Sequence, residues 1–73
     1  MIKPGIYKHS KSGREYKLIG VGKHSETLED VVIYEALYEN ELSQLWVRPI
    51  TMWEEKVLID GIEKPRFEFV REN

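Results

Sequence analysis

Apolar and polar residues alternate along much of the 73-residue chain, which is the pattern of half-buried β-strands. Turn-forming residues interrupt this pattern at intervals of roughly ten residues, as they do in small all-β domains. The pattern predicts one all-β domain over residues 1–73, without repeats or linkers. The expected strands cover residues 5–9, 14–23, 31–38, 42–48 and 66–70.

Individual residues refine the expected strands. Gly20 and Gly22 occupy alternate positions in the second strand, which indicates a bulge or a tight bend. Residues 31–38 are apolar on both faces apart from Glu35, so this strand is expected in the middle of the sheet. A helix over residues 29–38 is an alternative, but three consecutive β-branched residues disfavour it.

The last third of the chain combines turn, helix and strand signals. Pro49 ends the fourth strand, because it lacks a backbone N–H donor. The Thr-Met-Trp-Glu string that starts at Thr51 matches the capping box, in which the threonine hydroxyl caps a single helical turn. Asp-Gly at residues 60–61 tolerates the positive φ angles of a type I′ hairpin. The final strand alternates and is expected to bury Phe67 and Phe69.

These elements predict a small, partly open antiparallel barrel of the SH3-like type, with one helical turn before the last strand. An OB-like barrel is the first alternative, and an α+β roll with a longer helix near residues 51–58 is the second. In an SH3-like barrel the first and last strands are neighbours. This arrangement would bring Arg66 close to His9.

Composition excludes several classes of protein. The chain has no cysteine, so a disulfide scaffold, a thiolate nucleophile and a cysteine-ligated metal are impossible. No window approaches the apolar length of a membrane span, and the first residues lack the apolar run of a signal peptide. We therefore expect a cytoplasmic protein that does not contact a membrane.

The net charge and its distribution along the chain affect which class of binding partner is expected. The net charge is −2, although the first 25 residues contain six basic residues and one acidic residue. Phosphate backbones are normally bound by a net basic face, so the overall acidity weakens a nucleic-acid interpretation. A protein or a small ligand is favoured as the partner over nucleic acid, and homodimer formation stays an alternative.

Aromatic residues give the main indication of a binding surface. The chain has eight of them, more than a barrel of this size can enclose, so some are expected at its surface. An arginine beside an exposed ring can stack on a base or hold a carboxylate or phosphate. In the alternative interpretation Trp46 fills the core and Arg48 pairs with a glutamate. The predicted ligand-binding residues are Tyr7, His24, Glu26, Trp46, Arg48 and Arg66.

The string His-Ser-Glu-Thr, which starts at His24, does not indicate catalysis. Neighbours on a strand point to opposite faces, and no Gly-x-Ser-x-Gly turn presents a nucleophile. His9 and His24 do not have the spacing of a metal site. We therefore predict no catalytic residue, no metal and no cofactor. The string is expected to satisfy its own backbone donors in a loop, or to contact a ligand.

Several strings resemble the short bacterial proteins of Domain of Unknown Function 1653 (DUF1653). The most distinctive are His-Ser-Glu-Thr, from His24, and Trp-Val-Arg-Pro, from Trp46. The resemblance extends over nearly the whole chain and implies a compact bacterial domain, without an assigned reaction, cofactor or partner. It also implies that Trp53 replaces a phenylalanine common in the family, which would keep an aromatic side chain there.

These observations favour a small binding module with an aromatic and arginine surface. Its ligand could be a peptide, a nucleic-acid segment or a small anion. One alternative is a small-molecule enzyme that uses His24 as a base. Such an enzyme would share its site between subunits, because 73 residues leave little room for a pocket of roughly 300 Å³. The other alternative is a subunit that only associates with proteins.

Overall fold

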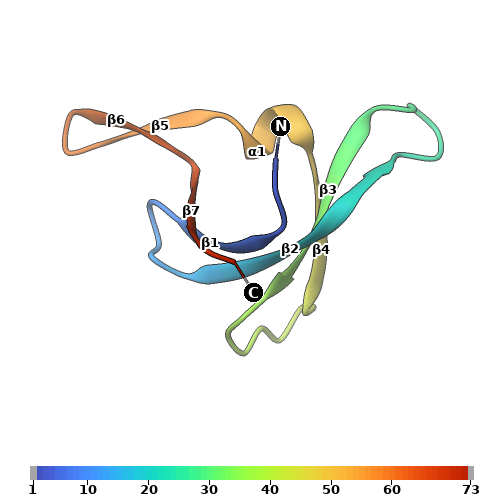
Figure 1. Cartoon of the computed structure of the whole chain (residues 1–73), viewed down its shortest axis with the longest axis horizontal. Helices are drawn as coiled ribbons and strands as arrows, with labels where there is room; N and C mark the ends of the chain where they lie inside the picture. Colours follow the sequence, from blue (N-terminus) through green and yellow to red (C-terminus); the bar gives the residue numbers. More distant parts are fainter. Residues whose placement is uncertain (1, 73) are drawn as a thin grey trace.

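The computed structural model describes residues 2–72, in which seven strands and one helical turn occur (Figure 1). In chain order the elements are β1 (Gly5–His9), β2 (Glu15–Lys23), β3 (Asp30–Ala36), β4 (Leu45–Pro49), α1 (Ile50–Trp53), β5 (Lys56–Ile59), β6 (Ile62–Pro65) and β7 (Phe67–Arg71). The predicted all-β class is therefore confirmed. The helical alternatives over residues 29–38 and 51–58 are wrong.

Five strands form one antiparallel sheet in the order β4-β3-β2-β1-β7. The first and last strands are thus neighbours, as predicted. The sheet curves but leaves β4 and β7 as its edges, so the barrel is partly open rather than closed (Figure 1). The helical turn precedes a separate hairpin, β5–β6, and then β7. Strand β3 lies inside the sheet, although β2 is its central strand.

Two local predictions from glycine are confirmed. The pairing of β2 with β3 shifts register between Leu18 and Gly20, which is the expected bulge. Asp60 and Gly61 have φ angles of 52° and 78°, as a type I′ turn between β5 and β6 requires. On the N-terminal side of the bulge, the register of β2 orients Tyr16 toward the core cluster.

The core is mainly aromatic. The Trp53 ring stacks on the Phe67 ring, with 3.8 Å between ring centres and 3° between ring planes. Tyr7 and Tyr34 contact the Trp53 ring at centre distances of 5.3 and 5.0 Å. The short helix α1 therefore delivers one large side chain between the two ends of the curved sheet. The buried cluster consists of Tyr7, Leu18, Val32, Tyr34, Trp53 and Phe67.

Two sequence-based expectations are wrong. Helix α1 begins at Ile50, with Pro49 as its N-cap, and no side chain caps it. Thr51 therefore lies inside the helical turn, because the extended Pro49 already makes the transition from β4. Phe69 is 38% exposed. Strand β7 is an edge strand, so β1 covers Phe69 from one side only, through an edge-on contact with Tyr7.

Candidate functional site

A groove lies on the inner side of the sheet, at the open end of the β2–β3 hairpin. It has two lobes, with volumes of about 230 and 400 Å³, that share a wall made by Tyr16, Tyr34, Tyr38 and Arg48. We call the smaller one the ring lobe and the larger one the basic lobe. The ring lobe is completed by Asn40, Leu42 and Trp46, and the basic lobe by His9, Ser12, Arg14 and Phe67.

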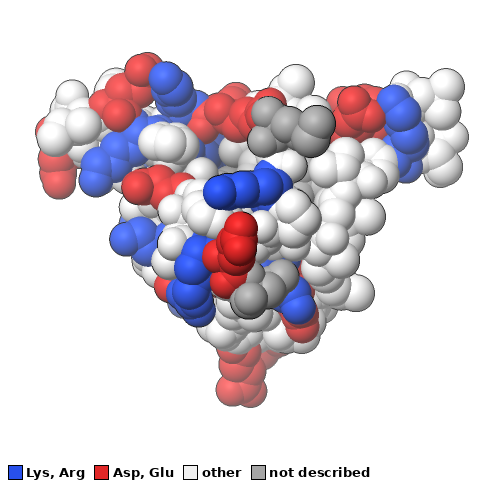
Figure 2. Space-filling view, in the orientation of Figure 1, with Lys and Arg blue, Asp and Glu red and all other residues white. Residues whose placement is uncertain are grey.

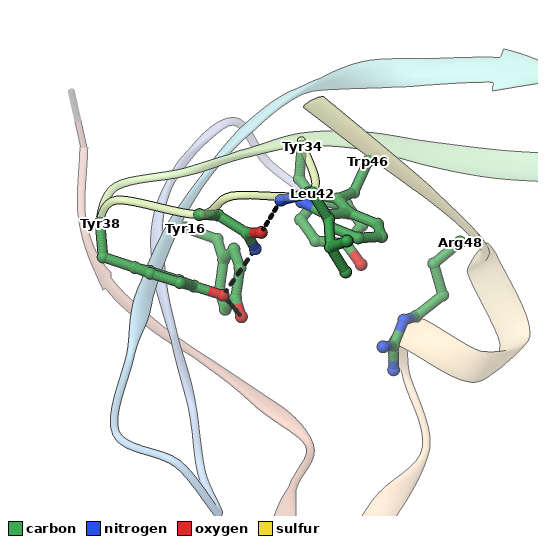
Figure 3. Close-up of a pocket in the computed structure, with 7 residues that line it drawn as sticks. Tyr16, Tyr34, Tyr38, Leu42, Trp46 and Arg48 are labelled. Carbon is green, nitrogen blue, oxygen red and sulfur yellow. Dashed lines mark hydrogen bonds between the residues drawn. The ribbon is translucent and has the colours of Figure 1, made fainter. Parts of the chain in front are cut away.

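The shared wall follows from strand register. Tyr34 on β3 pairs with Trp46 on β4, so both side chains are on the inner face of the sheet. Arg48 lies two residues beyond Trp46 and faces the same way. Figure 3 shows Tyr16 and Tyr38 at one side of the ring lobe and Arg48 at the other. The larger lobe alone exceeds 300 Å³, so a single chain does provide a pocket of ligand size.

Two of the wall tyrosines share a hydrogen bond. The hydroxyl oxygens of Tyr16 and Tyr38 are 2.8 Å apart. Burial raises the pKa of Tyr16 to about 12, whereas the hydrogen bond with Tyr16 lowers the pKa of Tyr38. Asn40 also donates to the Tyr38 oxygen, at 3.4 Å, so the Tyr38 hydroxyl takes part in two hydrogen bonds at this side of the ring lobe.

The ring lobe presents a fixed indole. The Trp46 N–H donates to the Ser43 carbonyl oxygen at 2.9 Å, which sets the orientation of the ring. The backbone N–H of Leu42 donates to the Asn40 side-chain oxygen at 2.9 Å. Leu42 lines the same lobe as Trp46 and Tyr34, and its side chain is 85% exposed. The connection between β3 and β4 thus holds one aromatic and one aliphatic side chain at the mouth of the lobe.

Two arginines border the groove without acidic partners. The guanidinium carbon of Arg48 is 5.2 Å from the centre of the Phe67 ring. That of Arg14 is 4.4 Å from the centre of the Tyr38 ring. Within residues 2–72 neither arginine forms an ion pair, and no carboxylate lines either lobe. The expected alternative, in which Arg48 pairs with a glutamate, is therefore not found.

This local positive charge is not a property of the surface as a whole. Figure 2 shows basic and acidic side chains interspersed over the face drawn, with acidic side chains at the tip formed by the β3–β4 connection. The other described arginines are paired: Arg66 with Glu55 at 3.2 Å and Arg71 with Glu15 at 3.6 Å. Unpaired arginine is thus concentrated at the groove.

His9 contributes to the basic lobe. Its ring packs edge-on against Phe67, with 5.1 Å between ring centres, and its Nδ1 accepts a hydrogen bond from the Ser12 backbone N–H at 3.3 Å. Burial lowers the pKa of His9, and nearby positive charges, with Arg48 contributing most, lower it further. An anion in the lobe would oppose this repulsion and favour the protonated ring.

The lowered pKa of His9 predicts a pH dependence of stability. The unfolded chain takes up a proton at an ordinary histidine pKa of about 6.5, whereas the folded protein takes it up only at lower pH. Stability is therefore complete above about pH 6.5 and decreases as pH falls through the pKa of the folded state. Melting temperatures across this range should fall less steeply for His9→Gln than for the wild type. Equal slopes for His9→Gln and the wild type would contradict the prediction.

The six predicted binding residues do not all converge. Trp46 and Arg48 line the groove together, as their shared strand face predicts. Tyr7 instead belongs to the core: it is 7% exposed, and its hydroxyl donates to the Lys3 carbonyl oxygen at 2.7 Å. Its placement is decided by the pairing of β1 with both β2 and β7, which encloses the ring.

Arg66 comes close to the groove but does not line it. The backbone N–H of Ser10 donates to the Arg66 carbonyl oxygen at 2.8 Å, so Arg66 does approach the His9 region as predicted. Its guanidinium turns to Glu55, and the Arg66 backbone N–H also donates to the Glu55 carbonyl oxygen at 2.8 Å. Arg66 therefore closes the base of the β5–β6 hairpin, and its charge still acts on His9.

His24 and Glu26 lie in the loop between β2 and β3, where both are exposed. The Nδ1 atom of His24 accepts hydrogen bonds from the backbone N–H groups of Glu26 and Thr27, at 3.1 and 3.3 Å. The loop thus satisfies several of its own backbone donors, through the His24 ring and the Thr27 hydroxyl, which accepts from the Glu29 backbone N–H at 3.3 Å. It projects from the closed end of the hairpin (Figure 1), and none of its residues lines the groove. His24, the general base that the enzyme alternative requires, therefore lies outside the groove.

Several groove residues were not predicted from the sequence, chiefly Arg14, Tyr16, Tyr34 and Tyr38. Alternation could have found one pair, because Arg14 and Tyr16 are two residues apart and share a face. The pairing of Tyr34 with Trp46 needed the register of β3 against β4. Tyr38 lies beyond the end of β3, where no alternation applies.

Other chemistry is limited in the part of the chain that the structure describes. Residues 2–72 contain no group of three or more His, Asp or Glu side chains that could hold a metal ion. Their one helical element is far too short to cross a membrane. The groove itself offers rings, hydroxyls, one carboxamide, one imidazole and two guanidinium groups.

Comparison with known proteins places the chain in a family. Residues 5–69 match the model of a protein family of unknown function, DUF1653. A crystal structure of a DUF1653 protein from Bordetella bronchiseptica is similar, with a TM-score of 0.91 and 33% sequence identity over 99% of this chain and 91% of that one. No curated protein matches the chain significantly. These two matches agree, and the chain belongs to the DUF1653 family.

Proposed function

We propose that the protein is a small bacterial, cytoplasmic binding module whose groove holds a ligand with an anionic group. The observation that carries this proposal is the pair of arginines, Arg14 and Arg48, that border an aromatic groove without carboxylate partners. The similarity to the Bordetella protein supports the bacterial origin.

The many acidic residues of the chain make the absence of ion pairs at Arg14 and Arg48, among the described residues, significant. The chain has thirteen acidic residues and eleven Lys and Arg residues, so ion pairs are readily available to a surface arginine. Arg14 and Arg48 instead lie over aromatic rings and form no ion pair within residues 2–72, so no carboxylate occupies their donors. A bound anion would meet these donors, whereas a bound cation would meet no counter-charge in the groove.

The walls strengthen the same conclusion. Tyr34 and Phe67 are 5% exposed and form an apolar floor under the charged groups. Apolar surroundings exclude water and make a charge-assisted hydrogen bond stronger than it is on an open surface. The Tyr38 hydroxyl adds a neutral polar group to the shared wall. The groove is therefore suited to a small anionic group better than to an extended polyanion, which would also need a basic surface outside it.

Titration with inorganic phosphate tests the proposal. We expect saturable changes in the amide NMR signals of Ser12, Arg14 and Tyr38, with affinity that decreases as salt is added. Arg48→Ala should weaken phosphate binding about tenfold, because it removes a charge-assisted interaction of roughly 1.5 kcal/mol. The melting temperature should change little.

The matched control is Lys56→Ala, which removes one positive charge from the β5–β6 hairpin, where Lys56 pairs with Glu63 at 3.9 Å. This variant should bind phosphate as the wild type does. If Arg48→Ala and Lys56→Ala reduced affinity equally, the binding would reflect net charge and the groove proposal would fail. It would fail also if phosphate produced no saturable change.

A further inference from the structure

The two lobes of the groove differ in chemistry and are joined through a polar wall. The ring lobe has the Trp46 indole and Leu42, which offer flat and apolar contact surface. The basic lobe has Arg14, His9 and Ser12, which offer donors for an anion. Because the lobes share residues, one ligand that spans both would place a ring at one end and an anionic group at the other.

The ring lobe fits a heteroaromatic ring. The Trp46 indole is held by its hydrogen bond to Ser43, so its face can receive a stacked ring without a loss of side-chain freedom. Stacking of a base on an aromatic side chain contributes about 1–3 kcal/mol. The Asn40 carboxamide donates one hydrogen bond to Tyr38 and accepts one from Leu42. It keeps one further N–H and one lone pair, which match the donor and acceptor edge of a base.

The shared wall fits a polar spacer. The Tyr38 hydroxyl and Arg48 line both lobes and can contact a group that lies between them. A ligand whose ring and anionic group are directly joined would leave these groups unused. A sugar between ring and phosphate would present hydroxyl oxygens to them. The order ring, hydroxylated spacer and phosphate is that of a nucleotide.

We propose that the groove binds a nucleoside monophosphate, with the base against Trp46 and Leu42 and the phosphate at Arg14. This inference rests on the proposed anion-binding function and gives it a ligand class. The phosphate could belong to a free nucleotide or to the 5′ end of a single strand. The overall charge of −2 favours the free nucleotide, because a longer strand would bring further phosphates to a surface of mixed charge.

Calorimetric titrations with AMP, ribose 5-phosphate and phosphotyrosine test the inference. AMP should bind at least about tenfold more tightly than ribose 5-phosphate, because it adds the stacking contact. Trp46→Leu should reduce AMP affinity to that of ribose 5-phosphate and leave ribose 5-phosphate binding unchanged. Arg14→Ala should weaken both ligands by a similar factor, and Lys56→Ala should affect neither.

Each contrary result has a distinct meaning. Equal affinity for AMP and ribose 5-phosphate would overturn the nucleotide assignment while the anion-binding function stands. Phosphotyrosine that binds as tightly as AMP would also overturn the nucleotide assignment, because its ring and phosphate have no sugar between them. Failure of every phosphate ligand would overturn the anion-binding function itself. A 5′-phosphorylated oligonucleotide that binds more tightly than AMP would support the assignment and identify a strand end as the source of the phosphate. An oligonucleotide that binds more weakly than AMP would support the assignment with the free nucleotide as the source.

Discussion

Replacing Trp53 with alanine is expected to lower the free energy of unfolding by about 3–5 kcal/mol. Trp53 is 3% exposed, stacks on Phe67 and contacts the rings of Tyr7 and Tyr34, so its removal leaves a cavity that three rigid rings cannot fill. A domain of 73 residues has a total stability of about 4–11 kcal/mol. The substitution therefore removes a large part of what holds the fold, and chemical denaturation followed by circular dichroism measures the loss.

Two further variants keep this prediction testable if Trp53→Ala does not fold. Trp53→Phe retains a ring in the stack and should lose only about 1–2 kcal/mol. Trp46→Ala removes the half-buried tryptophan of the groove and should lose less than Trp53→Ala. Equal losses for Trp46→Ala and Trp53→Ala would contradict the division between a core tryptophan and a groove tryptophan.

Replacing Gly5 with alanine is expected to cost about 2–3 kcal/mol of stability. Gly5 has a φ of 148°, which L side chains rarely adopt, and an added Cβ would lie 2.7 Å from the Arg71 carbonyl oxygen and 2.7 Å from Cε1 of Phe69. The clash with a backbone atom cannot be relieved by a rotamer change. It would push β7 away from β1 at the register shift beside Ile6, and so open one edge of the sheet.

Gly20→Ala is the matched control. Gly20 lies within β2, has no positive φ, and an added Cβ would meet no atom within 4 Å. An alanine there should leave stability unchanged or raise it by up to about 1 kcal/mol, because it reduces the freedom of the unfolded chain. Thermal and chemical unfolding of the two variants give the comparison. A Gly5→Ala protein as stable as Gly20→Ala would show that β7 does not pack on Gly5 as described.

The eight aromatic residues divide between the core and the surface of the domain. Four of the eight rings are buried in the core, and Trp46, Tyr16 and Tyr38 are half-buried at the groove. Tyr16 and Trp46 also pack against the core cluster. The position of the half-buried rings beside Arg14 and Arg48 is the basis of the binding proposal.

Strand identity and turn type were available from the sequence, because they depend on neighbours in the chain. Alternation of apolar residues locates β1, β2 and β7, and the Asp-Gly pair sets the φ angles of the β5–β6 turn. The helical turn begins two residues earlier than the capping motif predicts, with Pro49 rather than Thr51 as its N-cap. A local capping motif competed there with the geometry already set by Pro49 at the end of β4.

The groove was decided only in the tertiary structure. Sequence alternation places Trp46 and Arg48 on one face, but it cannot say that Tyr34 lies opposite Trp46 or that Tyr16 reaches Tyr38 across two strands. Those contacts depend on the register between strands, and a shift of one residue would turn each side chain to the other face of the sheet. For the same reason the sequence could not separate Tyr7, which is enclosed by two neighbouring strands, from the rings left at the open end.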